Sequence, residues 1–226
     1  MNRLSRALLG AFLLATAVDL VSLLAGADTG HLIAKPLLMP LLAGYAATQG
    51  APRALVAALV LGWGGDVFLM LDPDWAFLVG MACFAAGHVS YLTLFGRRRT
   101  SLPLGGLYAV ALAGTVVALW PDLPADLRIP VAGYSLLLTA MAYRASSLGV
   151  MAGIGGALFL LSDTLIATGV ADWPRLPGHD FWVMATYLAA QYLLTTGALR
   201  ATRTPRAPRA TGTAPRATGA APVPGA

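Results

Sequence analysis

The chain has 226 residues, of which 58% are apolar and only 11% are charged, against roughly a quarter in an ordinary soluble domain. A soluble core of this size cannot hide that much apolar surface, so the composition excludes a secreted enzyme, a soluble nucleotide-binding domain and a nucleic-acid-binding protein. The formal net charge of +5 does not indicate DNA binding, because most basic residues lie in short loops and a tail, where they report orientation in a membrane.

Two absences limit the chemistry further. The sequence contains no Glu, so all ten acidic residues are Asp. Its one cysteine, Cys83, lies in an apolar run, which excludes an intrachain disulfide and a CxxC metal site. Because there are only three histidines, we also expect no His-rich metal centre.

Eight apolar stretches predict an all-α fold, a polytopic integral membrane bundle of eight transmembrane helices. Each stretch is close to the roughly 20 residues with which a helix crosses a hydrocarbon layer of about 30 Å. None alternates as a barrel strand would, so helices are expected to satisfy the backbone hydrogen bonds. The stretches are Ala7–Ala25, His31–Thr48, Ala54–Leu71, Trp75–Phe95, Leu102–Trp120, Leu127–Tyr143, Leu148–Val170 and Phe181–Leu199.

The charges of the loops predict the orientation. If the N-terminus, with Arg3 and Arg6, lies in the cytoplasm, eight spans return the C-terminus to the same side. Of the loop arginines only Arg128 and Arg175 then fall outside, and no aspartate falls in an inner loop. The prediction is a multi-pass protein of the plasma membrane whose N- and C-termini are both cytoplasmic.

The domain organisation predicted from composition is a transmembrane domain over residues 1–199 and a tail over residues 200–226. The tail is rich in Ala, Thr, Pro, Arg and Gly without periodicity. Such a segment cannot bury enough apolar area to offset its chain entropy, so we expect it to be disordered and cytoplasmic. The first apolar run could be read as a secretory signal, but its length and Asp19 favour an uncleaved span.

Four charged residues lie inside the predicted spans, where burying a charge is costly and usually marks a functional site. They are Asp19, Lys35, Asp66 and Asp163. Each lies about four to seven residues from the outer end of its span, which is roughly 6–10 Å below the outer boundary. Charges from four helices in one layer indicate a shared site. The structural alternative is ion pairing with Lys35, and for Asp19 also snorkelling to the surface.

Small residues and prolines accompany these charges. Glycines at residues 62, 64 and 65 precede Asp66, and glycines at residues 155 and 156 precede Asp163. Small residues let helices approach closely and leave room for a ligand. Pro36 follows Lys35, with Pro40 four residues later, and both remove backbone donors and can kink the helix. These features favour a cavity around the charged layer.

Two helix faces add further polar groups. The fourth span carries a stripe with alternating spacings of four and three residues, and the eighth span carries Tyr187, Gln191 and Thr195 on one face. Interhelical hydrogen bonding is the structural alternative for both faces. The stripe consists of Phe77, Met81, Phe84, His88, Tyr91 and Phe95.

Five short segments follow one another over residues 30–195. They are Lys35-Pro36 with Pro40, Gly65-Asp66 ahead of Met70, Gly87-His88 with Tyr91, residues 156–163 ending in Ser162-Asp163, and Tyr187 with Gln191-Tyr192. In this order the segments resemble the lysoplasmalogenase (YhhN-like) membrane family. The resemblance implies cleavage of the vinyl-ether bond of a lysoplasmalogen, a lysophospholipid, to a fatty aldehyde and glycerophospho-ethanolamine or -choline. We expect no cofactor for this reaction, and a related lysolipid enol ether is an alternative substrate.

The chemistry of a vinyl ether suits the charged layer. Protonation of the β-carbon makes an oxocarbenium ion, water adds, and the hemiacetal collapses. Two carboxyls can divide such acid and base roles, as in glycosidases. Our hypothesis is that Asp66 and Asp163 are the catalytic pair and that Lys35 binds the lipid phosphate or tunes the pair. The residues expected to bind or orient the substrate are Lys35, His88, Tyr91, Ser162, Tyr187 and Gln191. The equal depth of the two aspartates suggests two parallel four-helix halves.

Three other functions compete with this interpretation. A proton- or cation-coupled transporter also uses buried charges, but it should carry polar groups on both sides of the midplane. A metal-dependent hydrolase using Asp66, Asp163 and His88 is disfavoured, because His88 lies roughly 10 Å deeper than the aspartates. A purely structural or partner-binding membrane protein would have little use for three buried acids.

Overall fold

The computed structural model describes residues 2–203. Within this range the chain forms eight α-helices and one short 3-10 helix, and contains no strand. The elements are α1 (Arg3–Ala25), α2 (Asp28–Thr48), α3 (Arg53–Phe68), α4 (Asp74–Phe95), α5 (Leu102–Leu119), α6 (Arg128–Ala145), η1 (Ser146–Leu148), α7 (Val150–Val170) and α8 (His179–Arg203). The all-helical prediction is confirmed, and each helix overlaps the apolar stretch that predicted it.

Four of the described helices are long and apolar enough to cross a membrane: α1, α4, α5 and α7. The prediction of eight spanning helices is therefore supported for half of them. With 16 residues, α3 is short for a hydrocarbon layer, and α2 carries Lys35 and two prolines within its length. Both helices contain a charged residue, and α2 also contains prolines, whereas a helix surrounded by lipid would be apolar throughout.

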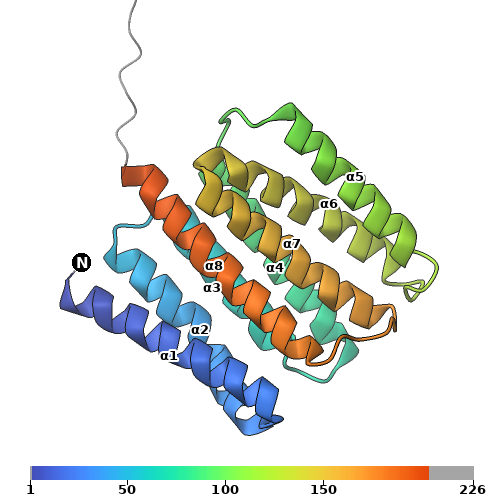
Figure 1. Ribbon diagram of the computed structural model, residues 1–226, viewed down its shortest axis with the longest axis horizontal. Helices are drawn as coiled ribbons and strands as arrows, with labels where there is room; N and C mark the ends of the chain where they lie inside the picture. Colours follow the sequence, from blue (N-terminus) through green and yellow to red (C-terminus); the bar gives the residue numbers. More distant parts are fainter. Residues whose placement is uncertain (1, 204–226) are drawn as a thin grey trace, which may run out of the picture.

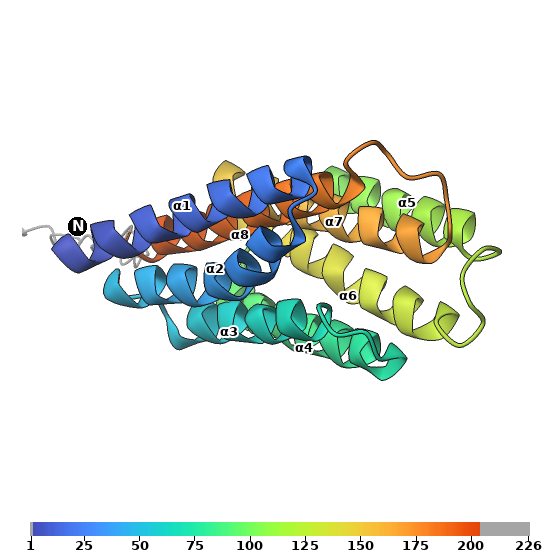
Figure 2. The same cartoon turned by 90° about the horizontal axis from the view of Figure 1, so that it is seen from below.

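Seven of the helices form a closed circuit around the core. Each of α1, α2 and α3 packs on the next helix, α4 packs on α6, and α6, α7 and α8 follow in order until α8 returns to α1. Figures 1 and 2 show α1 and α2 at one edge of this arrangement and α5 at the opposite edge. Helix α5 lies outside the circuit against α6, and Leu119 is its only buried residue. The hypothesis of two four-helix halves stays a prediction.

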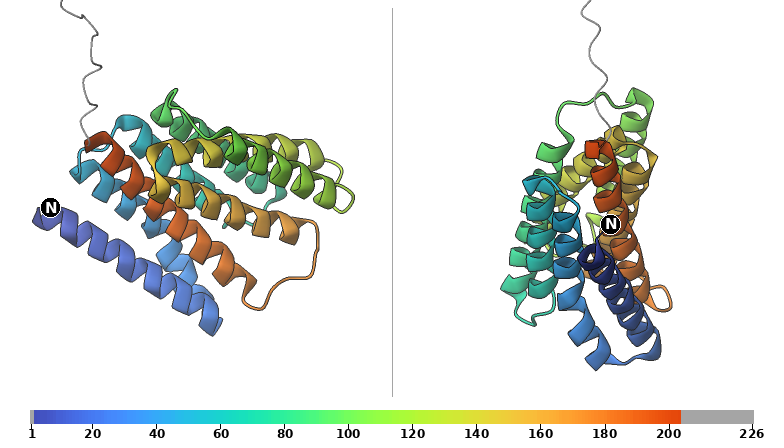
Figure 3. Two further views of the ribbon diagram at one scale, coloured as in Figure 1. Left: turned by 45° about the horizontal axis from the view of Figure 1, so that its top comes forward. Right: turned by 90° about the vertical axis from the view of Figure 1, so that its left-hand side faces the viewer.

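The two ends of the bundle differ in charge. At one end, Arg203 at the close of α8 and Ser5 in the first turn of α1 both hydrogen-bond Gln49, which follows α2. At the other end, the Nε1 of Trp173 donates to Asp122 over 2.8 Å, joining the α7–α8 and α5–α6 loops. We call the end with Arg203 the arginine-rich end and the end with Asp122 the aspartate-rich end. Figure 3 shows the N-terminus and the end of α8 at the same end of the molecule.

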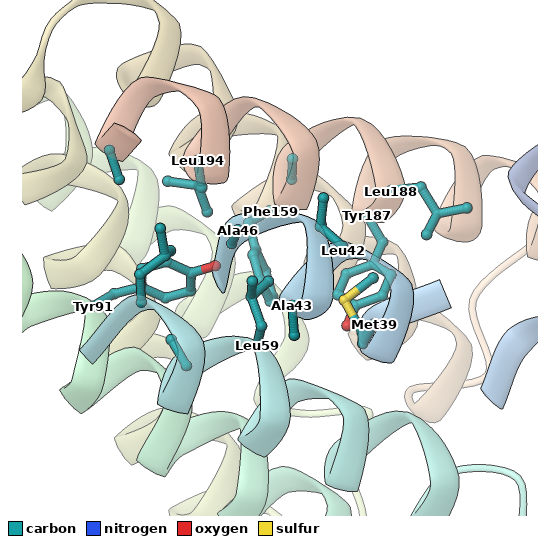
Figure 4. Packing of buried hydrophobic residues seen from close by; sticks show 14 of the residues in the cluster. Met39, Leu42, Ala43, Ala46, Leu59, Tyr91, Phe159, Tyr187, Leu188 and Leu194 are labelled. Carbon is teal, nitrogen blue, oxygen red and sulfur yellow. The ribbon is translucent and has the colours of Figure 1, made fainter. Parts of the chain in front are cut away.

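A large apolar core lies inside the circuit, between α2, α3, α7 and α8. Figure 4 shows this core, with Met39 and Leu42 of α2, Phe159 of α7 and Leu194 of α8 among its residues. The helices approach closely where a side chain is missing. A Cβ on Gly155 of α7 would lie 2.8 Å from the backbone nitrogen of Leu194, so only glycine allows this contact between α7 and α8.

The predicted tail, residues 200–226, begins inside an ordered element. Helix α8 continues to Arg203, four residues beyond the boundary that composition suggested. The rest of the predicted tail lies outside the described residues.

Candidate active site

A hydrogen-bonded network joins Asp163 to His88 through Tyr134. The Tyr134 hydroxyl on α6 donates to Oδ2 of Asp163 on α7, and it lies 3.0 Å from Nε2 of His88 on α4. Because the single hydroxyl proton points to Asp163, the hydroxyl oxygen accepts from His88, which must carry its proton on Nε2. The other ring nitrogen of His88 is buried and has no hydrogen-bond partner among the described residues. Three helices thereby fix one carboxyl.

Asp163 lines a cavity of about 310 Å³. The cavity lies between α4, α5, α6 and α7, and most of its lining is apolar. Tyr134 also lines it, and Asp163 is the only ionisable carboxyl in the lining. A volume of this size is at the lower end of the range for small-molecule sites. An apolar ligand in this cavity would therefore meet one carboxyl, which a hydrogen bond holds in place.

A second network surrounds Asp66. The Tyr187 hydroxyl on α8 donates to Oδ2 of Asp66 on α3 over 2.8 Å. Nε2 of Gln191 donates to that hydroxyl over 3.3 Å, and the Tyr91 hydroxyl donates to Oε1 of Gln191 over 2.7 Å. All four side chains are buried, and Asp66 is only 3% exposed. The network satisfies one oxygen of this carboxyl entirely within the protein.

An aromatic wall separates Asp66 from the cavity. The ring of Phe159 lies 5.5 Å from Tyr187 and 4.9 Å from His88, so it stands between the two networks. The Phe84 ring lines the cavity and packs on Gly65, where a Cβ would come within 2.5 Å of it. Asp66 is not part of the cavity lining. The two aspartates therefore occupy neighbouring but separate environments.

Lys35 lies near the second network and not in the cavity. Electrostatic interactions connect Lys35 with Asp66 and with Asp19. No carboxylate oxygen of the described residues lies within 4.0 Å of its ammonium group. Asp19 is fully buried, and its Oδ1 lies 2.8 Å from Nδ1 of His31. Lys35 is thus placed to act on the charge of Asp66, and the structure does not place it beside Asp163.

The prolines of α2 leave a carbonyl that a neighbouring helix uses. Pro40 has no N–H, so the carbonyl of Pro36 lacks its helical donor. The indole Nε1 of Trp63 on α3 donates to this carbonyl over 2.9 Å. The freed backbone group therefore joins α2 to α3 and does not line the cavity.

The other predicted substrate-binding residues, except Ser162, belong to one of the two networks. Tyr91, Tyr187 and Gln191 belong to the Asp66 network, and His88 belongs to the Asp163 network. The hydroxyl of Ser162 donates to the carbonyl of Val183 over 3.0 Å, which holds α7 against α8. No group of three His, Cys or Asp side chains suited to a metal occurs between residues 2 and 203.

Tyr134 is the site residue that sequence reasoning missed. It lies six residues after Arg128, the first residue of α6, which is about 9 Å along the helix. This depth is the same as that of the four charged residues. Counting the depth of every polar residue in its span, and not only of the charged ones, would have identified Tyr134. The tyrosine also explains how His88, which is deeper in its helix, reaches the layer of Asp163.

Known proteins are similar to the part of the chain that contains the two networks. The YhhN family matches residues 30–198 of the chain, which include every residue of both networks. Human (Homo sapiens) lysoplasmalogenase TMEM86B is 40% identical over 154 residues, covering 67% of this chain and 66% of that protein. No solved structure matches the chain.

Two further similar proteins come from other mammals. Lysoplasmalogenase TMEM86B of Sus scrofa is 40% identical over 149 residues, covering 65% of this chain and 63% of that protein. Lysoplasmalogenase TMEM86A of Bos taurus is 31% identical over 173 residues, covering 70% of each chain. The alignment with the TMEM86B proteins thus spans slightly less than two thirds of their length.

Proposed function

This chain belongs to the YhhN family, and we propose that it is a membrane-embedded hydrolase that cleaves the vinyl-ether bond of lysoplasmalogens or a related lysolipid enol ether. The products are a fatty aldehyde and a glycerophospho-ethanolamine or -choline. Support comes from the names of the similar proteins, which are lysoplasmalogenases. The single structural observation behind the proposal is Asp163, a carboxyl held by Tyr134 at the wall of an apolar cavity.

In the proposed first step, protonated Asp163 transfers its proton to the β-carbon of the vinyl ether. The carbon–carbon double bond supplies the electron pair for the new C–H bond, and an oxocarbenium ion forms next to the ether oxygen. Tyr134 acts as a positioning residue, because its hydrogen bond fixes one oxygen of the carboxyl and leaves the other free for the substrate. His88 positions Tyr134 in turn.

In the proposed second step, water attacks the oxocarbenium carbon and gives one proton to the Asp163 carboxylate. This restores the protonated acid and forms a hemiacetal. The hemiacetal then collapses: its hydroxyl loses a proton, the bond to the glycerol oxygen breaks, and that oxygen takes up a proton. Asp163 can relay this proton as well, so one carboxyl in the cavity balances every transfer.

Asp66 has a different proposed role from the carboxyl in the cavity. It is the second carboxyl of the predicted pair and acts without touching the substrate, because its negative charge stabilises the cation across the aromatic wall. The ring of Phe159 packs against both Tyr187 and His88, so the two networks are close together, which supports this assignment. Tyr187, Gln191 and Tyr91 hold Asp66, and Lys35 tunes its charge. The networks thereby separate the roles of two chemically identical side chains.

The membrane placement belongs to the same proposal. All eight helices cross the plasma membrane, with the arginine-rich end and both termini on the cytoplasmic side. The exposed side chains of α5 include Leu107, Val110 and Val117, which suit contact with lipid tails. A lysophospholipid then enters the cavity from the outer half of the bilayer.

Product analysis in heavy water tests the proposal. The purified protein in detergent is incubated with a lysoplasmalogen in D₂O, and the aldehyde is reduced at once to its alcohol and examined by mass spectrometry. Protonation of carbon by the enzyme places one deuterium on the carbon next to the former aldehyde. Release of aldehyde without this deuterium contradicts the mechanism. Absence of aldehyde from any enol-ether lipid contradicts the function and favours a transporter. Incubation with EDTA tests the metal-dependent alternative.

A further inference from the structure

The cavity around Asp163 contains no cation, yet the proposed substrate carries a phosphate. The lining residues are apolar or neutral apart from Asp163 itself. Lys35, the expected phosphate ligand, belongs to α2 and lies outside this lining. A lysophospholipid that places its vinyl ether at Asp163 therefore needs a positive group at the end of the cavity where its headgroup lies.

We infer that Arg128 binds the phosphate of the lysolipid headgroup, a role that rests on the function proposed above. Arg128 is half-buried at the start of α6, at the aspartate-rich end of the bundle. It lines a small hollow that shares Thr115, Val131 and Ser135 with the cavity wall. The hollow thus borders the cavity, and Arg128 lies on the wall of the hollow.

The guanidinium of Arg128 has free hydrogen-bonding capacity. Its Nε donates to the carbonyl of Leu123, and one Nη donates to the carbonyl of Pro121, each over 3.1 Å. Of the five N–H donors of a guanidinium, three remain. No carboxylate of the described residues pairs with it, and Asp122 in the same loop accepts from Trp173. The two loop carbonyls orient the group, and the remaining donors match the oxygens of a phosphate.

The spacing along α6 fits the proposed substrate. Arg128 and Tyr134 are six residues apart, which is about 9 Å of helix. In a lysoplasmalogen, seven bonds separate the vinyl β-carbon from the phosphorus, which is about 8 Å in an extended chain with three bonds per ~3.5 Å. A phosphate at Arg128 therefore places the vinyl ether beside the carboxyl that Tyr134 holds. The alkenyl chain then continues toward Ala157 at the deep end of the cavity.

Kinetics with two substrates test this inference. The wild type and Arg128→Gln are compared on a lysoplasmenylethanolamine and on the matching 1-alkenylglycerol, which lacks the phosphate. We expect the substitution to raise KM for the phospholipid by about tenfold, which corresponds to the loss of one or two charged hydrogen bonds. We expect kcat for the phospholipid and both constants for the alkenylglycerol to stay within about twofold, which is no more than a few tenths of a kcal/mol. Inorganic phosphate should weakly inhibit only the wild type, and only with the phospholipid.

A matched variant controls for general charge. Arg175→Gln removes the other arginine of the aspartate-rich end, which is exposed, and it should leave KM for both substrates unchanged. An equal loss on both substrates in Arg128→Gln would assign Arg128 a role in holding its loop only. Unchanged KM for the phospholipid would also overturn the inference.

Binding separates this inference from the proposed function. If the wild type cleaves no enol ether, binding of a non-cleavable alkyl-ether lysophospholipid is measured by calorimetry in detergent. Affinity that falls about tenfold in Arg128→Gln, the loss of a charged hydrogen bond, retains the phosphate site without the activity. Equal affinity in both proteins removes the phosphate site as well.

Discussion

The hydroxyl of Tyr134 on α6 donates a hydrogen bond to the carboxylate of Asp163 on α7. The same hydroxyl accepts from His88 on α4, so this network links the first four helices to the last four. The Asp66 network makes a second link of this kind, because Tyr187 on α8 donates to Asp66 on α3. Asp66 is thus fixed by a tyrosine from the opposite half of the sequence, and Asp163 by a tyrosine that His88 holds from the opposite half.

Replacing Tyr134 by Phe should impair catalysis more than folding. The substitution removes the one hydrogen-bond donor to Asp163 among residues 2–203 and leaves the ring to pack against His88. A hydrogen bond to a charged group contributes about 1.5–3 kcal/mol, so we expect kcat to fall by roughly 10- to 100-fold. The measurement is the initial rate of aldehyde release. Tyr108→Phe is the control, because Tyr108 on α5 packs on the ring of Tyr143 and lies outside both networks; a similar loss in both variants would refute the role of Tyr134.

Adjacent glycines on α3 should respond oppositely to alanine. A Cβ on Gly65 would lie 2.5 Å from the Phe84 ring, whereas a Cβ on Gly64 would lie 3.4 Å from the sulfur of Cys83. Gly65→Ala must displace the aromatic wall, at a cost of about 1–3 kcal/mol. Gly64→Ala should gain up to about 1 kcal/mol from its higher helix propensity. Thermal unfolding in detergent checks both, and greater stability of Gly65→Ala would show that Phe84 is not held as described.

The Tyr187 hydroxyl should contribute to stability through Asp66. In Tyr187→Phe the buried carboxyl loses its donor, so we expect the free energy of unfolding to fall by about 1.5–3 kcal/mol. Tyr192→Phe on the same helix is the matched control, because Tyr192 packs on Phe12 through its ring. Thermal unfolding midpoints of the two variants are compared. Equal midpoints would mean that the hydrogen bond to Asp66 adds nothing measurable.

A bulky residue at the deep end of the cavity should change chain-length preference. Ala157 lines the cavity, and Ala157→Phe would fill the space that we assign to the end of the alkenyl chain. We expect kcat/KM for a hexadecenyl substrate to fall by about tenfold relative to an octenyl substrate, because an apolar pocket discriminates on this scale. Ile154→Phe, on the exposed side of the same helix, is the control. An unchanged ratio in Ala157→Phe would place the chain elsewhere.

Apolar periodicity and loop charge were sufficient to predict the eight helices. Each predicted span overlaps one helix, and the loop arginines other than Arg128 and Arg175 lie at the opposite end from the loop aspartates. Hydropathy alone does not account for α3 or α2, which are short or polar for a span. Such helices depend on neighbours that cover their polar residues, and these contacts are not visible in a single sequence.

Charges inside a membrane span are rare, and Asp66 and Asp163 were proposed as site residues on this basis. The wall of Phe84 and Phe159 between their environments was not predicted. Side-chain direction on separate helices decides which group faces a cavity, and sequence spacing within one helix does not contain that information. Arg128 was counted only as a loop charge for the same reason.

The most direct test of the account compares two isosteric substitutions. Aldehyde release from a lysoplasmalogen is measured for the wild type, Asp163→Asn and Asp66→Asn after each protein has been shown to be folded in detergent. Loss of general acid–base catalysis typically costs about 10²–10⁴-fold, so we predict that much loss in Asp163→Asn and a smaller loss in Asp66→Asn. Wild-type rates in a folded Asp163→Asn protein would contradict the assignment of Asp163 as the acid in the cavity.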